Sequence, residues 1–189
     1  MMIMGIDPGT RSTGYGIVRW AEGDAVCVEY GAIRSPGRLS AWECHVRIVD
    51  GIAKLIQEYA LDAVAVESQF FCKNVRTALR IGEARSVALL PVTRAGVPIF
   101  EYAPARVKQS VVGNGNARKE QVQGMVRSLL RIREAITPDD AADALAIALC
   151  HAQTNAFKER LQRSSSLKEY STTSIRRVPS STARVSVTS

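Results

Sequence analysis

Two short apolar segments of the chain each end in a carboxylate, and this feature limits the folds that are open to it. Residues 2–7 read MIMGID and residues 62–67 read DAVAVE, so Asp7 and Glu67 close runs that are typical of buried strands. A charge at the end of an apolar run is costly unless something compensates for it. The carboxyl ends of strands are also the places where α/β sheets form their sites. We therefore predict an α/β fold with a site at the ends of these two strands.

The hydrophobic pattern alternates between strands and helices along the rest of the chain. Further strands are predicted over residues 13–20, 25–33 and 97–102, with a hairpin turn at 22–24. Helices are predicted over residues 40–59, with Ser40 as N-cap, and over 73–95, 106–112, 118–133 and 138–157. Three strands followed by alternating helices and strands predict a central mixed five-stranded sheet flanked by helices.

The net charge of +7 is concentrated near the C-terminus. Residues 158–189 contain seven Lys or Arg residues and two Glu residues, in a segment rich in Ser and Thr. Because this segment lacks the apolar periodicity of a packed element, we predict one folded domain over residues 1–157 and a basic tail that is disordered from about residue 164. The tail either contacts nucleic acid or a partner, or has no fixed role. No basic-then-apolar leader and no apolar run of membrane length is present, so we expect a cytoplasmic protein.

A third acidic signal lies at the start of the helix predicted after Pro138. The helix start alone explains Asp139 and Asp140, because Asp140 completes a capping box with Thr137 and early acids favour the helix dipole. It does not explain Asp143, since the residues around Asp143 are apolar on nearly every side and such a helix is buried. Asp140 and Asp143 are three residues apart and share one helix face. We therefore expect two carboxylates to point together from this helix.

Four acids without His or Cys partners are hard oxygen ligands, which suit Mg²⁺ or Mn²⁺. The chain has only two histidines and its four cysteines are scattered, so neither a zinc site nor a disulfide framework is expected. The typical chemistry of such a set is phosphodiester hydrolysis by two metal ions about 3.5–4 Å apart. For Asp7 the alternative is a turn cap before Pro8, but the same explanation fits Glu67 poorly.

Several short motifs, taken together, resemble one bacterial nuclease family. They are Ile6-Asp7-Pro8-Gly9-Thr10, Thr13-Gly14-Tyr15-Gly16, Val66-Glu67 with Phe70 and Lys73-Asn74, Phe100-Glu101-Tyr102, Val107-Lys108-Gln109, Val111-Val112-Gly113 and Asp140-Ala141-Ala142-Asp143-Ala144-Leu145-Ala146. In order and spacing, over about residues 2–152, these motifs resemble the crossover-junction endonuclease family RuvC. The resemblance implies a ribonuclease H-like fold, a homodimer and cleavage of four-way (Holliday) junction DNA in recombination and repair. It also implies work beside the branch-migration proteins RuvA and RuvB.

The resemblance implies a metal site as well. By position, the two Mg²⁺ ions of the family, for which Mn²⁺ can substitute, would be bound by Asp7, Glu67, Asp140 and Asp143. Asp139 is then the spare acid of the helix start. The residues alone leave the choice between Asp139 and Asp140 open, and the Asp-Ala-Ala-Asp spacing favours Asp140.

Basic and aromatic residues near the acids are candidates for DNA contact. The family implies that Lys108 and Lys119 contact phosphate and stabilise charge near the active site, and that a ring at Phe70 stacks on a base. The alternative for Phe70 is a core position together with Phe71. Further candidates for phosphate contact are Lys73, Arg76 and Arg118, with a solvated helix face as the alternative for the first two.

Other functions fit parts of this sequence less well. Residues 7–10 also resemble the first phosphate motif of actin-like ATPases, but no second glycine-rich phosphate turn is present. A ribonuclease H-like RNA-processing nuclease would cut structured RNA in preference to four-way DNA. A non-catalytic DNA-binding module would not need Asp143. The helix over residues 73–95 has more apolar residues than one buried stripe requires, and it is the predicted dimer contact.

Overall fold

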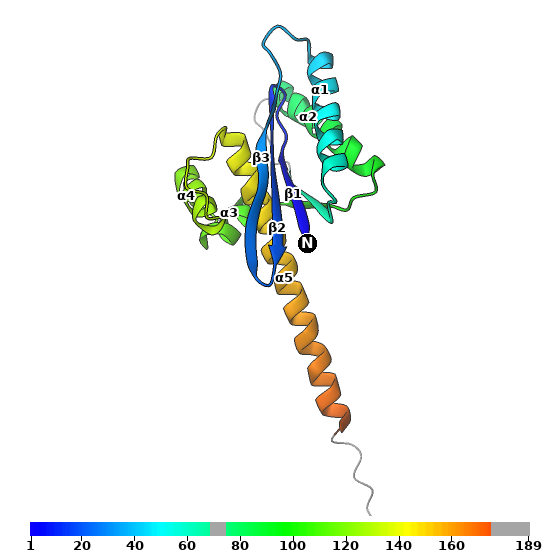
Figure 1. Cartoon of the computed structure of the whole chain (residues 1–189), viewed down its shortest axis with the longest axis vertical. Helices are drawn as coiled ribbons and strands as arrows, with labels where there is room; N and C mark the ends of the chain where they lie inside the picture. Colours follow the sequence, from blue (N-terminus) through cyan, green and yellow to red (C-terminus); the bar gives the residue numbers. More distant parts are fainter. Residues whose placement is uncertain (69–74, 175–189) are drawn as a thin grey trace, which may run out of the picture. The chain divides into compact units, whose positions relative to one another are not determined.

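The structure, a computed structural model, describes residues 1–68 and 75–174, with side chains described up to residue 164 (Figure 1). By internal contacts the chain divides into Met1–Thr154 and Asn155–Ser189, and the sheet belongs to the first of these units. Among the described helices, none combines the length and the hydropathy that crossing a bilayer requires.

The first unit is built on a mixed five-stranded sheet, as predicted, with the strand order β3-β2-β1-β4-β5. Antiparallel pairing joins β1 to β2 and β2 to β3, whereas β1 and β4, and β4 and β5, pair in parallel. Glu22 and Gly23 form the predicted hairpin turn with φ values of 53° and 93°, both in the left-handed region that such turns require. The strands are β1 Met2–Asp7, β2 Ser12–Ala21, β3 Asp24–Arg34, β4 Ala63–Glu67 and β5 Ile99–Tyr102.

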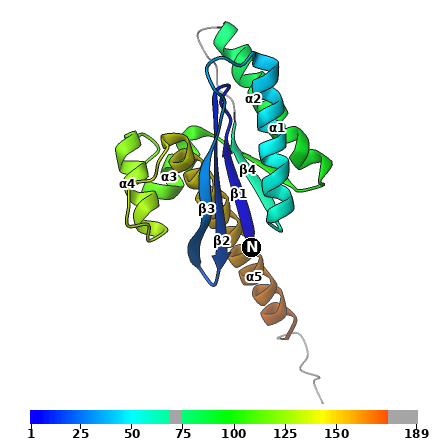
Figure 2. The ribbon, with the colours of Figure 1, turned by 45° about the horizontal axis from the view of Figure 1, so that its top comes forward.

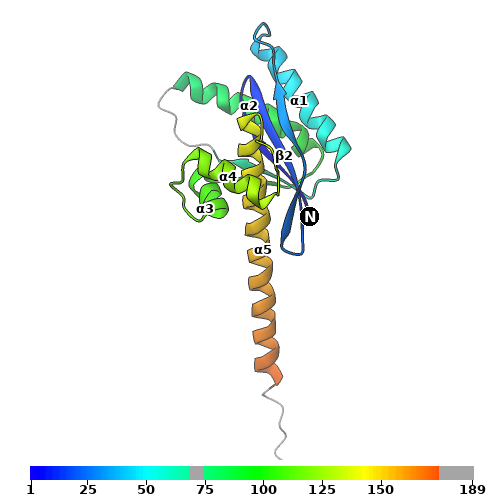
Figure 3. The ribbon, with the colours of Figure 1, turned by 60° about the vertical axis from the view of Figure 1, so that its left-hand side comes forward.

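Helices cover both faces of the sheet (Figure 2). One face packs against α1 (Ala41–Glu58) and α2 (Val75–Arg94). The other face packs against α3 (Pro104–Val112), α4 (Lys119–Leu129) and the first part of α5 (Asp139–Ser174), which Figure 3 shows in front of the strands. Two hydrophobic cores result, one on each side of the sheet.

Side-chain alternation along the central strands decides which residues face α5. Ile3 of β1 and Ala65 of β4 belong to the core that contains α5, while Met4 belongs to the core of α1 and α2. Successive side chains of a strand point to opposite faces. Asp7 and Glu67 are therefore on the same face as Ile3 and Ala65, which is the face that α5 covers.

Glycines in the strands let α5 approach the sheet closely. A Cβ atom at Gly5 would collide with the backbone of Ala144, and one at Gly14 would collide with the backbone of Asp140. Gly14 is also the residue of β2 that pairs with Asp7 of β1. Because Gly14 has no side chain, the first turn of α5 can lie beside Asp7.

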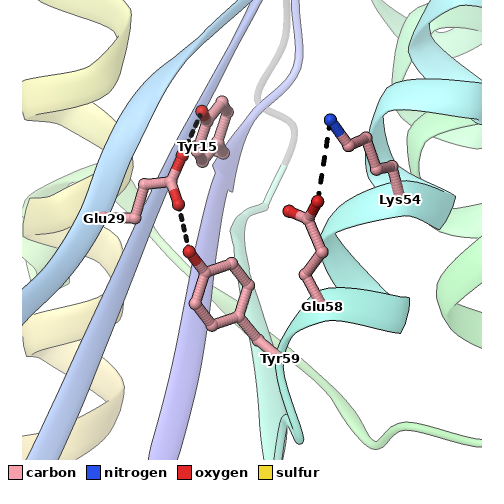
Figure 4. A network of polar contacts seen from close by, with 5 residues as sticks. All are labelled: Tyr15, Glu29, Lys54, Glu58 and Tyr59. Carbon is pink, nitrogen blue, oxygen red and sulfur yellow. Dashed lines mark hydrogen bonds and ion pairs between the residues drawn. The ribbon is translucent and has the colours of Figure 1, made fainter.

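The helix α1 is held at both ends. Ser40 is its N-cap, as predicted, in a capping box where the Ser40 backbone N–H donates to Glu43 Oε2 at 2.8 Å. Just beyond the other end, Tyr59 donates to Glu29 of β3, which also accepts a hydrogen bond of 3.1 Å from the Tyr15 hydroxyl (Figure 4). This network connects the end of α1 to β2 and β3.

The largest difference from the predicted elements concerns α5. The sequence predicts a helix end near Phe157, but α5 continues to Ser174, so residues 158–174 are helical. This segment has no apolar periodicity, yet it also contains neither Gly nor Pro, and no residue in it stops a helix. The predicted helix end is therefore wrong, while the division into a folded domain and a disordered tail stays a prediction, and residues 175–189 lie outside the described residues.

Smaller differences affect other helices. α3 begins at Pro104 rather than near residue 106. α4 ends at Leu129 rather than at residue 133, and the chain turns at Arg131, whose φ of 54° is in the left-handed region.

Candidate active site

One pocket of about 240 Å³ lies where β1, β4, α3, α4 and α5 meet. Acids enter it from the two strands and from α5, and lysines enter it from α3 and α4. The pocket is lined by Asp7, Glu67, Pro104, Val107, Lys108, Lys119, Val122, Asp143, Ala146 and Ile147.

Asp7 and Glu67 are neighbours because their strands pair in parallel. Ile6 pairs with Val66, and the next residue of each strand is the acid. Burial raises the pKa of Asp7 to about 7, with further increases from the nearby charges of Asp143, Asp140 and Glu67. Burial also raises the pKa of Glu67. The two strand ends therefore carry carboxyl groups that are costly to ionise unless a cation is present.

Asp143 is only half-buried, which corrects the prediction of a buried acid. Its neighbours Ala142 and Ala144 are buried, but the Asp143 side chain is 36% exposed because it opens into the pocket. Lys119 Nζ lies 3.1 Å from Asp143 Oδ2 and 3.2 Å from Asp139 Oδ2. Burial raises the pKa of Asp143, and the hydrogen bond from Lys119 opposes that increase.

Asp139 and Asp140 have different surroundings although they are adjacent. The Ser12 hydroxyl of β2 donates to Asp140 Oδ2, and the charge of Asp140 contributes to the raised pKa of Asp7. The side chain of Asp139 is 68% exposed and makes the ion pair with Lys119. Asp140 thus contacts the sheet through Ser12, whereas Asp139 is exposed and contacts Lys119.

The donor set fits a divalent cation in its chemistry. Carboxylates are the ligands that Mg²⁺ and Mn²⁺ prefer. Burial raises the pKa of Asp7 most and the neighbouring carboxylates raise it further, and a bound cation would favour the ionised form against both effects. In the described part of the chain, no three His, Cys, Asp or Glu side chains are grouped closely enough to hold an ion as they stand. Lys119 Nζ lies 3.1 Å from Asp143 Oδ2 and compensates part of its negative charge.

Two of the predicted DNA contacts belong to this pocket. Lys108 and Lys119 line it. Arg118 is exposed at the N-cap of α4, and Arg76 is exposed on the first turn of α2. The remaining candidates, Phe70 and Lys73, lie outside the described residues.

Sequence reasoning missed three residues that lie against the acids. Ser12 contacts Asp140, Gly14 makes room for it, and Arg85 of α2 donates to the main-chain oxygen of Glu67. Glycine inside a strand indicates a close backbone approach, so Gly14 carried a usable signal. No local pattern marks Ser12 or Arg85, because their partners are distant in the sequence.

Comparison with known proteins points to one family. The family described as "Crossover junction endodeoxyribonuclease RuvC" matches residues 3–151. The protein of that name from Protochlamydia amoebophila is 45% identical over 159 residues, which cover 84% of this chain and 95% of the relative. The one from Rubrobacter xylanophilus is 50% identical over 151 residues, which cover 80% of this chain and 84% of the relative.

Solved structures agree with the sequence match. T. thermophilus RuvC in complex with a Holliday junction substrate superposes with a TM-score of 0.76 at 38% identity, over 80% of this chain and 93% of that one. The yeast mitochondrial Holliday junction resolvase shares the fold, with a TM-score of 0.61 at 14% identity over 82% of this chain and 80% of that one. The predicted ribonuclease H-like fold is confirmed. The chain belongs to the RuvC family of crossover junction endodeoxyribonucleases.

Proposed function

We propose that this chain resolves four-way (Holliday) DNA junctions by hydrolysing phosphodiester bonds in two opposed strands. The observation that carries the proposal is the pocket in which Asp7, Glu67 and Asp143 face Lys108 and Lys119. Carboxylates provide cation ligands, and lysines provide contacts to phosphate. The junction as substrate is supported by the T. thermophilus RuvC complex, a relative with 38% identity.

The residues proposed to hold the metal are Asp7, Glu67, Asp140 and Asp143. If these four carboxylates held two Mg²⁺ ions, the ions would supply a nucleophilic water and charge stabilisation for the leaving oxygen. Asp140 is preferred to Asp139 because Ser12 directs its carboxylate toward the sheet, where its charge acts on Asp7.

The lysines of the pocket would bind and orient the scissile phosphate. Lys119 lies between Asp139 and Asp143 and compensates part of their negative charge. Lys108 faces Glu67 and lowers its pKa, against the larger effect of burial. A phosphate that enters the pocket therefore meets positive charge from both α3 and α4.

A homodimer through α2 is part of the proposal. The buried face of α2 includes Ala84 and Ala88, which pack against the sheet, while Leu79 on another face is 64% exposed. Val75 and Leu90 are exposed as well. A two-fold symmetric dimer would match the approximate two-fold symmetry of a four-way junction. Action beside RuvA and RuvB and a cytoplasmic location stay predictions from the family resemblance.

The test of this function compares substrates and metals. A synthetic four-way DNA junction, a linear duplex and a structured RNA are each incubated with Mg²⁺, Mn²⁺, Ca²⁺ or Zn²⁺. We expect cleavage of the junction with Mg²⁺ or Mn²⁺ and very little with Ca²⁺, because its looser coordination misplaces the reacting groups. Preferential cleavage of the RNA would support the RNA-processing alternative. Strong activity with Zn²⁺ alone would count against a carboxylate site.

A further inference from the structure

We propose that Arg85 is a positioning residue that fixes Glu67 at the edge of the active site. The proposal rests on the proposed function, since Glu67 is one of its metal ligands. Arg85 lies on α2, on the opposite face of the sheet from the pocket, so it acts on the strand rather than on the substrate.

One guanidinium group joins three elements at this point. Arg85 Nη1 donates to the main-chain oxygen of Glu67, the last residue of β4. Arg85 Nη2 lies 2.8 Å from Glu101 Oε1 on β5. The side chain of Arg85 is only 13% exposed, so its position is set by the packing of α2 on the sheet.

The contact falls where the β1–β4 ladder has ended, although Glu67 is still paired with β5. On one side, the register of β1 and β4 runs from Ile3–Ala63 to Ile6–Val66. On the other side, Glu67 pairs with Tyr102, and the Ser68 N–H donates to the Tyr102 carbonyl at 2.8 Å. Arg85 thus supplies a fixed contact to the carbonyl of Glu67, while the Glu67 carboxylate acts in the pocket on the other face.

The chemistry of the contact requires arginine. A guanidinium is planar and donates two hydrogen bonds in a fixed geometry, whereas a lysine ammonium is a compact charge on a flexible stem. A nearly buried cation is tolerated only when it is paired, and Glu101 supplies the paired charge. Arg85→Lys therefore keeps the charge and loses the two-point geometry. Glu101→Gln keeps a hydrogen-bond acceptor and loses the charge that holds Arg85 in place.

The experiment uses the full chain in four forms: wild type, Arg85→Lys, Glu101→Gln and the control Arg94→Lys. Arg94 is exposed on the same helix, so its substitution matches the chemical change without the contact. The first readout is Mn²⁺ affinity of the DNA-free protein, followed by electron paramagnetic resonance. The others are junction binding in Ca²⁺ and the single-turnover cleavage rate.

We expect Arg85→Lys and Glu101→Gln to weaken Mn²⁺ affinity and slow cleavage by about 10–100-fold, the typical effect of losing a group that orients a metal ligand. Junction binding should be unchanged, because it rests on contacts to phosphate. Arg94→Lys should match the wild type in all three readouts.

The proposal is overturned if both variants keep the wild-type Mn²⁺ affinity and cleavage rate. This holds even if the thermal stability of the variants is lower. Should Arg85→Lys fail to fold, Glu101→Gln decides, because the Glu101 side chain is 57% exposed and its amide is nearly isosteric. If the wild type binds Mn²⁺ but does not cut four-way junctions, the proposed function fails. The Mn²⁺ titration still decides the role of Arg85 in that case.

Discussion

Loss of a proposed metal ligand should remove cleavage, whereas loss of a lysine of the pocket should weaken contact with the DNA. Asp7→Asn, Glu67→Gln, Asp140→Asn and Asp143→Asn each neutralise a proposed ligand. We expect each to lower the single-turnover cleavage rate at least about 100-fold, since losing a direct ligand should exceed the loss of a group that only orients one. Junction affinity, measured by gel shift, should be largely retained because it depends on Lys and Arg contacts to phosphate.

The adjacent acid is the matched control for this set. Asp139→Asn should retain most of the activity, because Asp139 is 68% exposed and pairs with Lys119 rather than with the sheet. An inactive Asp139→Asn together with an active Asp140→Asn would show that the two acids have been assigned the wrong way round.

The hydrogen bond from the Ser12 hydroxyl to Asp140 can be tested by substitution of Ser12. Ser12→Val removes the donor to Asp140, whereas Ser12→Thr keeps a hydroxyl at nearly the same volume as valine. We expect Ser12→Val to weaken Mn²⁺ affinity by about 10–100-fold and Ser12→Thr to stay close to the wild type. Equal losses in the two variants would mean that side-chain volume matters at this position and the hydrogen bond does not.

Between elements, the packing of α5 on the sheet depends on glycines. Gly5→Ala and Gly14→Ala place a methyl group where the backbone of α5 lies. We expect each to lower the free energy of unfolding by about 1–3 kcal/mol or more, as measured by urea denaturation, because overpacking forces the backbone to shift.

A glycine in open space serves as the control for this prediction. Nothing lies within 4 Å of a Cβ atom built at Gly37, and its backbone is not in the left-handed region. Gly37→Ala should therefore change stability by no more than about 0.5 kcal/mol. Wild-type stability in Gly5→Ala and Gly14→Ala would contradict the close packing of α5.

The strands and the helix that carry the acids could be predicted, because short stretches of sequence determine where they begin and end. Asp7 and Glu67 end short apolar runs, and the alternation of side chains in a strand places them on the face with α5. The helix start at Asp139 and the spacing of Asp140 and Asp143 also follow from local signals.

What the sequence could not predict depends on contacts between distant residues. Ser12 and Asp140 are 128 positions apart, and Arg85 and Glu67 are 18 apart, so no periodicity marks either pair. The exposure of Asp143 was missed for a related reason. An apolar helix predicts burial, and only the fold shows that a pocket opens at this residue.

For the whole molecule, the dimer can be tested by mixing chains. Resolving a junction needs two matched cuts, and each chain would make one of them in the pocket described above. Wild-type protein is mixed with an excess of Asp7→Asn chains and added to a cruciform plasmid. Heterodimers should nick one strand and fail to linearise the plasmid promptly, so linear product should fall more steeply than total nicking. A parallel fall of both products, with sedimentation of a junction-bound monomer, would rule out the dimer.

The most direct measurement of the proposed activity maps the cuts themselves. A synthetic four-way junction, labelled on each strand in turn, is incubated with Mg²⁺ and either the wild type or Asp143→Asn. We expect the wild type to make paired nicks at symmetric positions in two opposed strands, and Asp143→Asn to make almost none. Cuts confined to one strand, equal cutting of a linear duplex, or undiminished cutting by Asp143→Asn would contradict junction resolution by this carboxylate pocket.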